Sequence, residues 1–267
     1  MRRLRLALLL VVAILPSQAQ AARILALSPH ACEMLYAIGG GPQVVGAVSY
    51  CDYPAEAKQL PRIGSYERIN VEAALRLKPD VAVVINRNVG GVAMLERMGV
   101  RIVLSNPDSF EAIFTDLLQM GDITGHRHHA DALVAGLRSR LKRIRQRPKS
   151  KLPVFYEVWN DPILTAGGPS FITELIREAG GRNIFADIAV ETPHVSVESV
   201  IRAKPAVIII PLEERSLAQR QTFWQQWLGG QKVRFVAINP DLLHRPGPRL
   251  LDGLELLQQA LQKAGDE

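Results

Sequence analysis

The chain has 267 residues, of which 48% are hydrophobic and 22% are charged, so it can bury a sizeable core and is neither a disordered tail nor a fibrous repeat. Its length suits one large domain or two lobes. Two cysteines are too few for a disulfide-based scaffold, and the formal net charge is +6.

The N-terminus has the pattern of a secretory signal. Arg2, Arg3 and Arg5 precede ten apolar residues at positions 6–15, and Ala19-Gln20-Ala21 is a small-x-small cleavage sequence. Ten residues form a helix about 15 Å long, half of a bilayer core, which disfavours the alternative of an uncleaved anchor. We therefore expect cleavage near Ala21 and export. The remaining 29 basic and 26 acidic side chains give no reason to expect binding to nucleic acid.

The first half alternates short apolar runs with amphipathic segments. Ser28-Pro29 has the pattern of a helix start, and Gly39-Gly40-Gly41 ends that helix. Strands are predicted at residues 23–27, 44–48, 81–85 and 101–105, and helices at 29–38, 71–77 and 92–98. This alternation is typical of a parallel sheet with helices on its faces.

The longest helical pattern lies between the two halves. From His126 to Gln146 apolar residues recur at spacings of three and four, and such a helix spans about 30 Å. Its C-terminal part is strongly basic, from Arg138 onward. A solvated outer face with cations at the helix C-terminus is favoured over a nucleic-acid or lipid patch, since no aromatic residues interleave.

The second half alternates in the same way as the first. Strands are predicted at residues 154–159, 207–210 and 233–238, and helices at 169–179, 222–228 and 249–263.

A duplicated segment relates the two halves. Residues 70–81 (NVEAALRLKPDV) match residues 196–207 (SVESVIRAKPAV) at a constant offset of 126. The repeat predicts an α/β protein of two Rossmann-like lobes, residues 22–125 and 149–267, joined by one long backbone helix at 126–148. Ligands of open α/β sheets bind beyond the carboxyl ends of the strands, so a cleft between the lobes is the expected site.

Each copy of the repeat has a glutamate in the first turn of its helix, at Glu72 and at Glu198. An acid there stabilises the helix dipole by about 0.3–1 kcal/mol. The helix dipole explains a single glutamate of this kind, but it explains less well why each lobe has a glutamate at the same position. Two equivalent acids also suit two basic sites on a two-fold symmetric partner, and we favour this docking role while keeping both.

These motifs resemble the class III periplasmic binding proteins of ABC importers, which carry vitamin B12, haem and iron-siderophores. The resemblance covers residues 22–265. It rests on ALSP at 26–29 followed by Glu33, VVG at 44–46, YCDYP at 50–54, Gly64, NVE at 70–72, LKPD at 77–80, and GGRNIF at 180–185. It implies two lobes bridged by a rigid helix, a periplasmic location and a monomeric receptor. It also implies a membrane permease dimer as the partner that Glu72 and Glu198 contact.

Within that family the chain is most similar to the cobalamin-binding proteins, whose Ser-Tyr-Ser-Asp-Tyr-Pro segment corresponds to residues 49–54. The resemblance implies that Tyr50 contacts the corrin ring, that Asp52 belongs to the same binding segment, and that Tyr66 supplies a second aromatic side chain. Thr192 stands where a cleft tryptophan is expected. Haem or an iron-siderophore is the alternative cargo, and a non-transport interaction module is the third possibility.

Residue chemistry adds further candidates for ligand contact. Trp159 ends a predicted strand of the second lobe and suits a flat ligand. Arg245 and Arg249 suit amide or carboxylate edges, although Arg249 equally fits a solvated start of the last helix. His30 and His194 are candidate axial ligands to a metal within the cargo, against a solvent-facing role that we favour.

Cys32 and Cys51 would reach an oxidising compartment after export, where they either pair or remain free. The chain contains no Gly-x-Ser-x-Gly, His-Glu-x-x-His or Walker sequence. We therefore predict binding without catalysis, with no catalytic cofactor and no resident metal.

Overall fold

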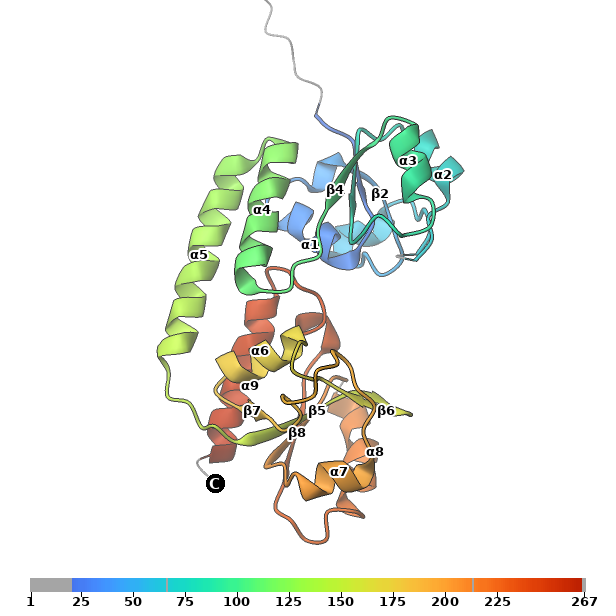
Figure 1. Cartoon of the computed structure of the whole chain (residues 1–267). Coiled ribbons are helices and arrows are strands. Elements are labelled where there is room, and N and C mark those ends of the chain that lie inside the picture. Colours follow the sequence, from blue (N-terminus) through green and yellow to red (C-terminus); the bar gives the residue numbers. More distant parts are fainter. Residues whose placement is uncertain (1–20, 66, 213, 266–267) are drawn as a thin grey trace, which may run out of the picture.

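Two separate sheets form the framework of the two lobes (Figure 1). The computed structural model describes residues 21–65, 67–212 and 214–265, so residues 1–20 of the predicted signal, and Tyr66, lie outside the described residues. The first sheet has the parallel order β2-β1-β3-β4, made by β1 (Ile24–Ala26), β2 (Val44–Ala47), β3 (Val81–Val84) and β4 (Arg101–Leu104). Around it lie α1 (Pro29–Ala37), η1 (Gly41–Gln43), η2 (Ala55–Gln59), α2 (Val71–Arg76), α3 (Val92–Arg97) and α4 (Phe110–Thr124).

The second sheet repeats this order. In it β5 (Pro153–Asn160) pairs in parallel with β7 (Arg182–Asn183) and β8 (Val207–Ile210), and β9 (Arg234–Ala237) follows β8. The strand β6 (Ile163–Thr165) returns antiparallel along β5 and has no counterpart in the first sheet. The remaining elements of this lobe are α6 (Phe171–Glu178), α7 (Val197–Arg202), α8 (Glu214–Gln225), η3 (Pro240–Leu242) and α9 (Leu250–Gly265).

The duplication seen in the sequence is thus a duplication of topology. In both copies a side chain caps the helix, because Asn70 Oδ1 and Ser196 Oγ each accept a hydrogen bond from the amide three residues later, at 3.0 and 3.2 Å. The lysines that follow, Lys78 and Lys204, have φ angles of 46° and 50°, a left-handed turn that leads into β3 and β8. The predicted α/β class with parallel sheets is confirmed.

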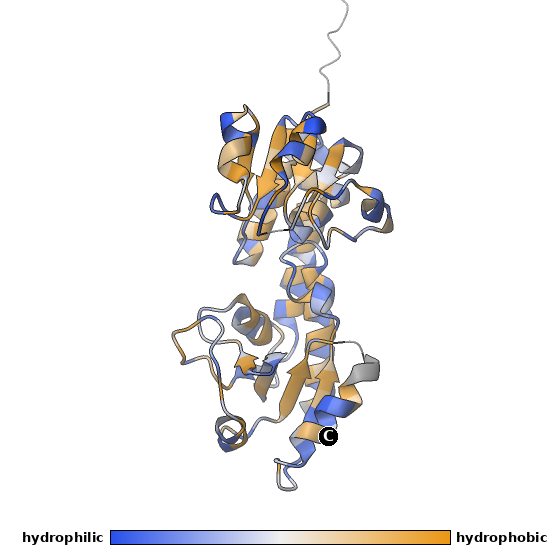
Figure 2. Ribbon diagram, turned by 90° about the vertical axis from the view of Figure 1, so that its right-hand side faces the viewer, coloured by the Kyte–Doolittle hydropathy of each residue, from blue (hydrophilic) through white to orange (hydrophobic). Residues whose placement is uncertain are grey.

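The strands bury side chains on both faces. On β3 and β8 alternate residues point into a core shared by the two lobes, namely Val81, Val83, Val207 and Ile209. Their neighbours point into separate outer cores, one in each lobe. Figure 2 shows the strands as mainly hydrophobic, with hydrophilic residues on the surrounding helices and loops. Because the shared core is continuous through α4, α5 (Arg127–Gln146) and α9, packing joins the lobes on that side.

The helix α5 runs beside both lobes (Figure 1). It packs against α4 at the first lobe and against α9 at the second. Several cations of its basic part, which we predicted to be solvated, pair with acids of neighbouring helices: Arg138 with Glu111, Arg140 with Asp252 and Glu255, and Arg145 with Glu178. The basic segment therefore contributes to the attachment of α5 and is only partly a solvated face.

Several elements differ from the sequence prediction, among them α4, α8 and β6. The helix α4 was not predicted, although Ser109 caps it and its buried residues, such as Phe110, Phe114 and Leu117, have helical spacing. The helix α8 begins at Glu214, eight residues before the predicted start. The strand β6 was missed because three residues carry too little periodicity. Within the described residues, every helix is too short or too polar to cross a bilayer.

Candidate functional site

A cavity of about 410 Å³ opens between the two lobes. Its lining includes His30, Ile85 and Asp108 from the first lobe, and Phe171, Thr192 and His244 from the second. Ile85 directly follows β3, and His30 lies in the first turn of α1, immediately after β1. The cavity therefore lies at the carboxyl ends of the strands, where the α/β architecture leads us to expect a ligand.

The wall on the first lobe is built around His30. Ser28 ends the connection from β1 and caps α1, and its hydroxyl lies 3.3 Å from His30 Nε2. The same Nε2 lies 2.9 Å from the carbonyl oxygen of Ser105, to which it donates a hydrogen bond. Burial lowers the pKa of His30, and the Ser105 carbonyl only partly opposes this effect. His30 is therefore a neutral wall residue whose Nε2 is already engaged within the protein.

The wall on the second lobe has a similar neutral pair. The Tyr156 hydroxyl, on a fully buried side chain of β5, lies 2.9 Å from His244 Nε2. Burial raises the pKa of Tyr156 and lowers the pKa of His244. Both groups are therefore uncharged at neutral pH, and the cleft offers polar but neutral contacts at this position.

The lobes also meet through an aromatic contact beside the cavity. Phe171 begins α6, which Ser170 caps, and its ring lies 5.5 Å from the ring of Phe110 at the start of α4, centroid to centroid. The interplanar angle of 70° is an edge-to-face arrangement, worth about 0.5–1.5 kcal/mol beyond the buried area. This contact helps to fix the width of the cleft.

Large aromatic side chains are exposed near the carboxyl ends of two strands, Tyr50 after β2 and Trp159 on β5. Tyr50 is 66% exposed with a φ of 65°, and Trp159 is 60% exposed while its indole N–H donates to the carbonyl of Asp161. Neither is among the residues that line the central cavity. Trp159 instead lines an adjoining cavity of about 270 Å³, which shares Val158 with the central one. Exposed rings of this size suit stacking on a flat ligand.

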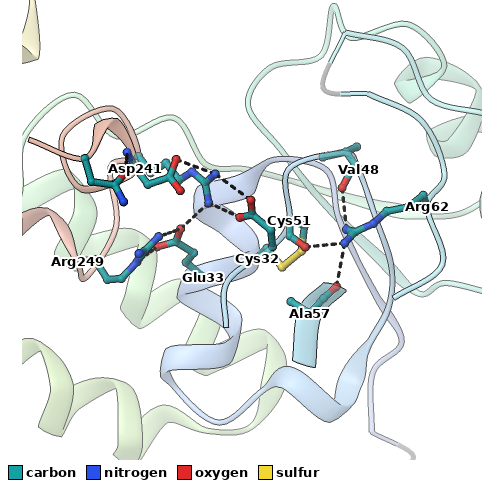
Figure 3. Close-up of polar contacts among 11 residues, drawn as sticks. Cys32, Glu33, Val48, Cys51, Ala57, Arg62, Asp241 and Arg249 are labelled. Atoms are coloured by element: carbon teal, nitrogen blue, oxygen red, sulfur yellow. Dashed lines mark hydrogen bonds and ion pairs between the residues drawn. A yellow bond between two sulfur atoms is a disulfide. The ribbon is translucent and has the colours of Figure 1, made fainter. Parts of the chain in front are cut away.

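Five charged residues tie the lobes together, and we call them the interlobe clamp: Glu33, Asp52, Asp241, Arg245 and Arg249 (Figure 3). Arg249 donates two hydrogen bonds to the Glu33 carboxylate, at 2.9 and 2.6 Å. Arg245 donates to Glu33 at 3.0 Å and to Asp52 at 2.6 Å, and it pairs with Asp241 at 2.9 Å. Glu33 and Asp52 belong to the first lobe, and the other three belong to the second.

The clamp is partly buried, which strengthens its ion pairs. The side chain of Glu33 is only 2% exposed, and those of Arg245 and Arg249 are 12% and 17% exposed. Burial alone would raise the pKa of Asp52, but the hydrogen bond and charge of Arg245 outweigh it and hold that pKa below its usual value. The Arg249 guanidinium also lies 3.7 Å from the centroid of the Tyr53 ring, a cation–π contact.

The loop that presents Asp52 is held from two sides. Cys51, next to Asp52, forms a disulfide with Cys32, the residue before Glu33 in α1. Arg62 donates hydrogen bonds to the carbonyl oxygens of Val48, Cys51 and Ala57, at 3.0, 2.8 and 3.2 Å (Figure 3). The disulfide therefore joins the two segments of the first lobe that supply acids to the clamp.

The structure brings together only some of the predicted ligand residues. Asp52 pairs with Arg245, and Arg249 reaches this group through Glu33, so the two arginines face protein acids. Thr192 lines the cavity, whereas His194 is exposed and its backbone forms an isolated antiparallel β-bridge with Leu164. Among the described residues no group of three or more potential ligands could hold a metal ion.

Glu33 is a residue of the family motif in the sequence, and its role in the clamp was not predicted. An acid in the middle of a mainly apolar helix was the available signal, since such an acid needs a cation when it is buried.

Glu72 and Glu198 lie away from the cavity, on exposed first turns of α2 and α7. Glu72 is 83% exposed and pairs with Arg76 at 2.7 Å. A hydrogen bond from its own backbone amide, and another from Ser196, lower the pKa of Glu198. In Figure 1 these helices lie toward the outer parts of the two lobes, on the side away from α5.

Comparison with known proteins places these features in a wider group. The family described as "Periplasmic binding protein" matches residues 24–226. The vitamin B12-binding protein of Yersinia pseudotuberculosis serotype O:1b is 32% identical over 265 residues, covering 96% of this chain and 92% of the relative. The vitamin B12-binding protein of Photorhabdus laumondii is 30% identical over 250 residues, covering 91% and 89%.

Solved structures show the same relationship. The periplasmic vitamin B12 binding protein BtuF of Vibrio cholerae has a TM-score of 0.82 and 31% identity, covering 92% of this chain and 99% of that chain. The periplasmic heme-binding protein RhuT from Roseiflexus sp. RS-1 has a TM-score of 0.78 and 26% identity, with the same coverage.

Proposed function

The chain belongs to the periplasmic binding protein family, as its motifs predicted, and we propose that it captures cobalamin (vitamin B12) between its lobes and delivers it to an ABC importer. The observation that carries the proposal is the cleft itself. It is an open cavity at the carboxyl ends of two duplicated sheets, with neutral polar groups in its walls and exposed aromatic rings nearby. The named relatives supply the choice of cargo.

Binding would use complementary parts of the cleft. The exposed faces of Tyr50 and Trp159 would stack on the corrin, one from each lobe, with Tyr66 as a further aromatic contact. The amide side chains at the edge of the corrin would meet polar groups of the cavity lining such as Thr192 and His244. Because packing and the clamp hold the lobes, we expect affinity to come from a preformed cleft and little closure.

Arg245 and Arg249 keep a supporting role in this proposal. Their guanidinium groups are bonded to Glu33 and Asp52, so they would hold the two walls at a fixed separation. Asp52 would act with them, positioning the loop that includes Tyr50.

Delivery would use the two equivalent glutamates. Glu72 and Glu198 are exposed on corresponding helices of the two lobes, which suits two cationic sites related by the two-fold axis of a permease dimer. In this account the receptor is a monomer in the periplasm, its signal removed near Ala21, and it transports its ligand without catalysis.

Haem or an iron-siderophore is the alternative cargo for the same cleft, supported by the likeness to a heme-binding protein at 26% identity. In that case His30 or His194 would be the candidate axial ligand, although His30 Nε2 is engaged by Ser105. An interaction module with an empty cleft is the remaining alternative.

Equilibrium titration separates these candidates. Tryptophan fluorescence is followed while purified protein is titrated with cyanocobalamin, haemin or a ferric siderophore. Saturable binding of cyanocobalamin, tighter than that of the other two, is expected. Tight binding of haemin alone would select the alternative cargo, and the absence of any binding would select the interaction module.

The docking role has its own test. Replacing both Glu72 and Glu198 with glutamine should abolish uptake by cells while leaving cobalamin affinity unchanged. As a matched control, Glu111→Gln removes another exposed acid and should leave uptake intact. Loss of affinity in the double variant would contradict the docking role.

A further inference from the structure

We infer that the interlobe clamp and the acids around the cleft make this site select ligands edged with neutral amides over ligands edged with carboxylates. The inference rests on the proposed function and deepens it, because it states which chemical class of cargo the cleft admits. It depends on the partners of the two clamp arginines, Arg245 and Arg249, and on the sign of the charges that line the cavity.

The clamp arginines are already neutralised by protein acids. Arg249 directs two of its donors at Glu33, and Arg245 contacts Glu33, Asp52 and Asp241. Arg245 lies between His244 and Pro246, which both line the cavity, so the clamp lies directly behind the cavity wall. Two cations and three acids leave the clamp with a net charge of −1. The exposed Lys58 adds a weaker attraction to Asp52.

The charged side chains of the cavity wall have one sign. Among the described residues that line it, Asp108 and Glu191 are charged, and none is a lysine or an arginine. Burial lowers the pKa values of the two lining histidines, His30 and His244, so that neither supplies positive charge at neutral pH. A ligand in this cavity therefore meets two acids in the wall and a clamp of negative net charge behind it.

This charge pattern discriminates between two edges of the same shape. A primary amide can donate hydrogen bonds to Asp108 and Glu191, whereas a carboxylate can only accept and is repelled by them. Repulsion between a ligand carboxylate and one acid about 10 Å away, at an effective dielectric constant of about 20, weakens the binding constant by about tenfold or more. Salt would reduce this effect, since the cleft is open to solvent.

The test compares two probes that differ by one charge. Cyanocobalamin and its monocarboxylic acid, in which one side-chain amide is hydrolysed, are titrated into the protein at low and at physiological salt. We expect the amide form to bind about tenfold more tightly at low salt, and less so at higher salt. Equal or tighter binding of the acid by the unmodified protein would overturn the inference.

Variants identify the residues responsible. Asp108→Asn with Glu191→Gln removes the two wall acids, which are exposed and need not disturb the fold, and should reduce the preference to less than about threefold. Asp52→Asn frees part of Arg245 and should also favour the acid. Asp122→Asn, which removes an exposed acid paired with Arg127, is the matched control and should keep the tenfold preference. An unchanged preference in the Asp108/Glu191 double variant would overturn the inference.

A wrong choice of cargo gives a different result from a wrong inference about charge selection. If cyanocobalamin does not bind, the choice of cobalamin is wrong, and the comparison is repeated with haemin and its dimethyl ester. Tighter binding of the ester would support selection against carboxylates. Tighter binding of the dicarboxylate would overturn it.

Discussion

Replacing Glu33 with glutamine should destabilise the protein more than replacing any exposed acid. The Glu33 side chain is 2% exposed and accepts three hydrogen bonds from two arginines. Glutamine has a similar shape but no charge, and its NH₂ group would replace one carboxylate oxygen that accepts hydrogen bonds from the arginines. Arg249 would lose the carboxylate to which it donates, whereas Arg245 would keep Asp52 and Asp241.

The magnitude follows from the burial of the three groups. Removing one partner of a buried charged network costs about 3–5 kcal/mol, because an uncompensated charge remains. The arginines are 12% and 17% exposed and can regain some hydration, so we take the lower end, about 3 kcal/mol. For a chain of this length about 1 kcal/mol shifts Tm by about 2–4 °C, so a fall of about 6–12 °C is expected.

Thermal and urea unfolding, each followed by circular dichroism, measure this effect. Glu111→Gln, which breaks an exposed pair with Arg138, is the control and should cost less than about 1 kcal/mol. Adding Arg249→Gln to Glu33→Gln should recover part of the loss, since the uncompensated cation is removed. A cost for Glu33→Gln no larger than that of the control would refute the structural role of the clamp.

Three further predictions concern the binding surface, the disulfide and the buried His30. In fluorescence titrations, the variants Tyr50→Ala and Trp159→Ala should each bind cobalamin about tenfold more weakly or worse. The variant Tyr50→Phe should change the affinity less than about threefold. An unchanged affinity in Tyr50→Ala would show that Tyr50 is not part of the site. Cys32→Ser should lower the free energy of unfolding by about 3 kcal/mol, because the disulfide links residues 19 apart, and a reductant should affect only the unmodified protein. Burial lowers the pKa of His30 in the folded state, so the unfolded state binds the proton more readily. Keeping His30 neutral therefore contributes stability that is complete above about pH 6.5 and is lost as pH falls toward the folded-state pKa. Tm should therefore fall between pH 7.5 and 5.5, and it should fall less in His30→Gln; an equally steep fall would contradict the assignment.

The sequence predicted those parts of the fold in which local signals agree. Ser28-Pro29 and Asn70 mark helix starts by their capping chemistry, and the repeat at 70–81 and 196–207 predicted two lobes that have the same strand order. The helix α4 shows a similar signal, with a capping serine at 109 and helical spacing of buried residues, and it was overlooked beside the longer pattern of α5. The start of α8 is poorly marked because its apolar face is weak.

The site was harder to predict because its key contacts join residues far apart in the chain. Arg245 and Arg249 stood out as cations, but their partners lie more than 190 residues away, at Glu33 and Asp52. No local pattern indicates such a pairing, and it gives the two arginines an interlobe role that the sequence did not predict. The disulfide between Cys32 and Cys51 was one of two alternatives, since the spacing of the cysteines says nothing of the distance between them.

The most direct measurement of the central claim is a crystal structure of the protein with cyanocobalamin. The account predicts one corrin ring between the lobes, with Tyr50 on one face, Trp159 on the other, and the clamp intact behind the cavity wall. A macrocycle bound outside the cleft, or a cleft that stays empty at saturating cyanocobalamin, would contradict it.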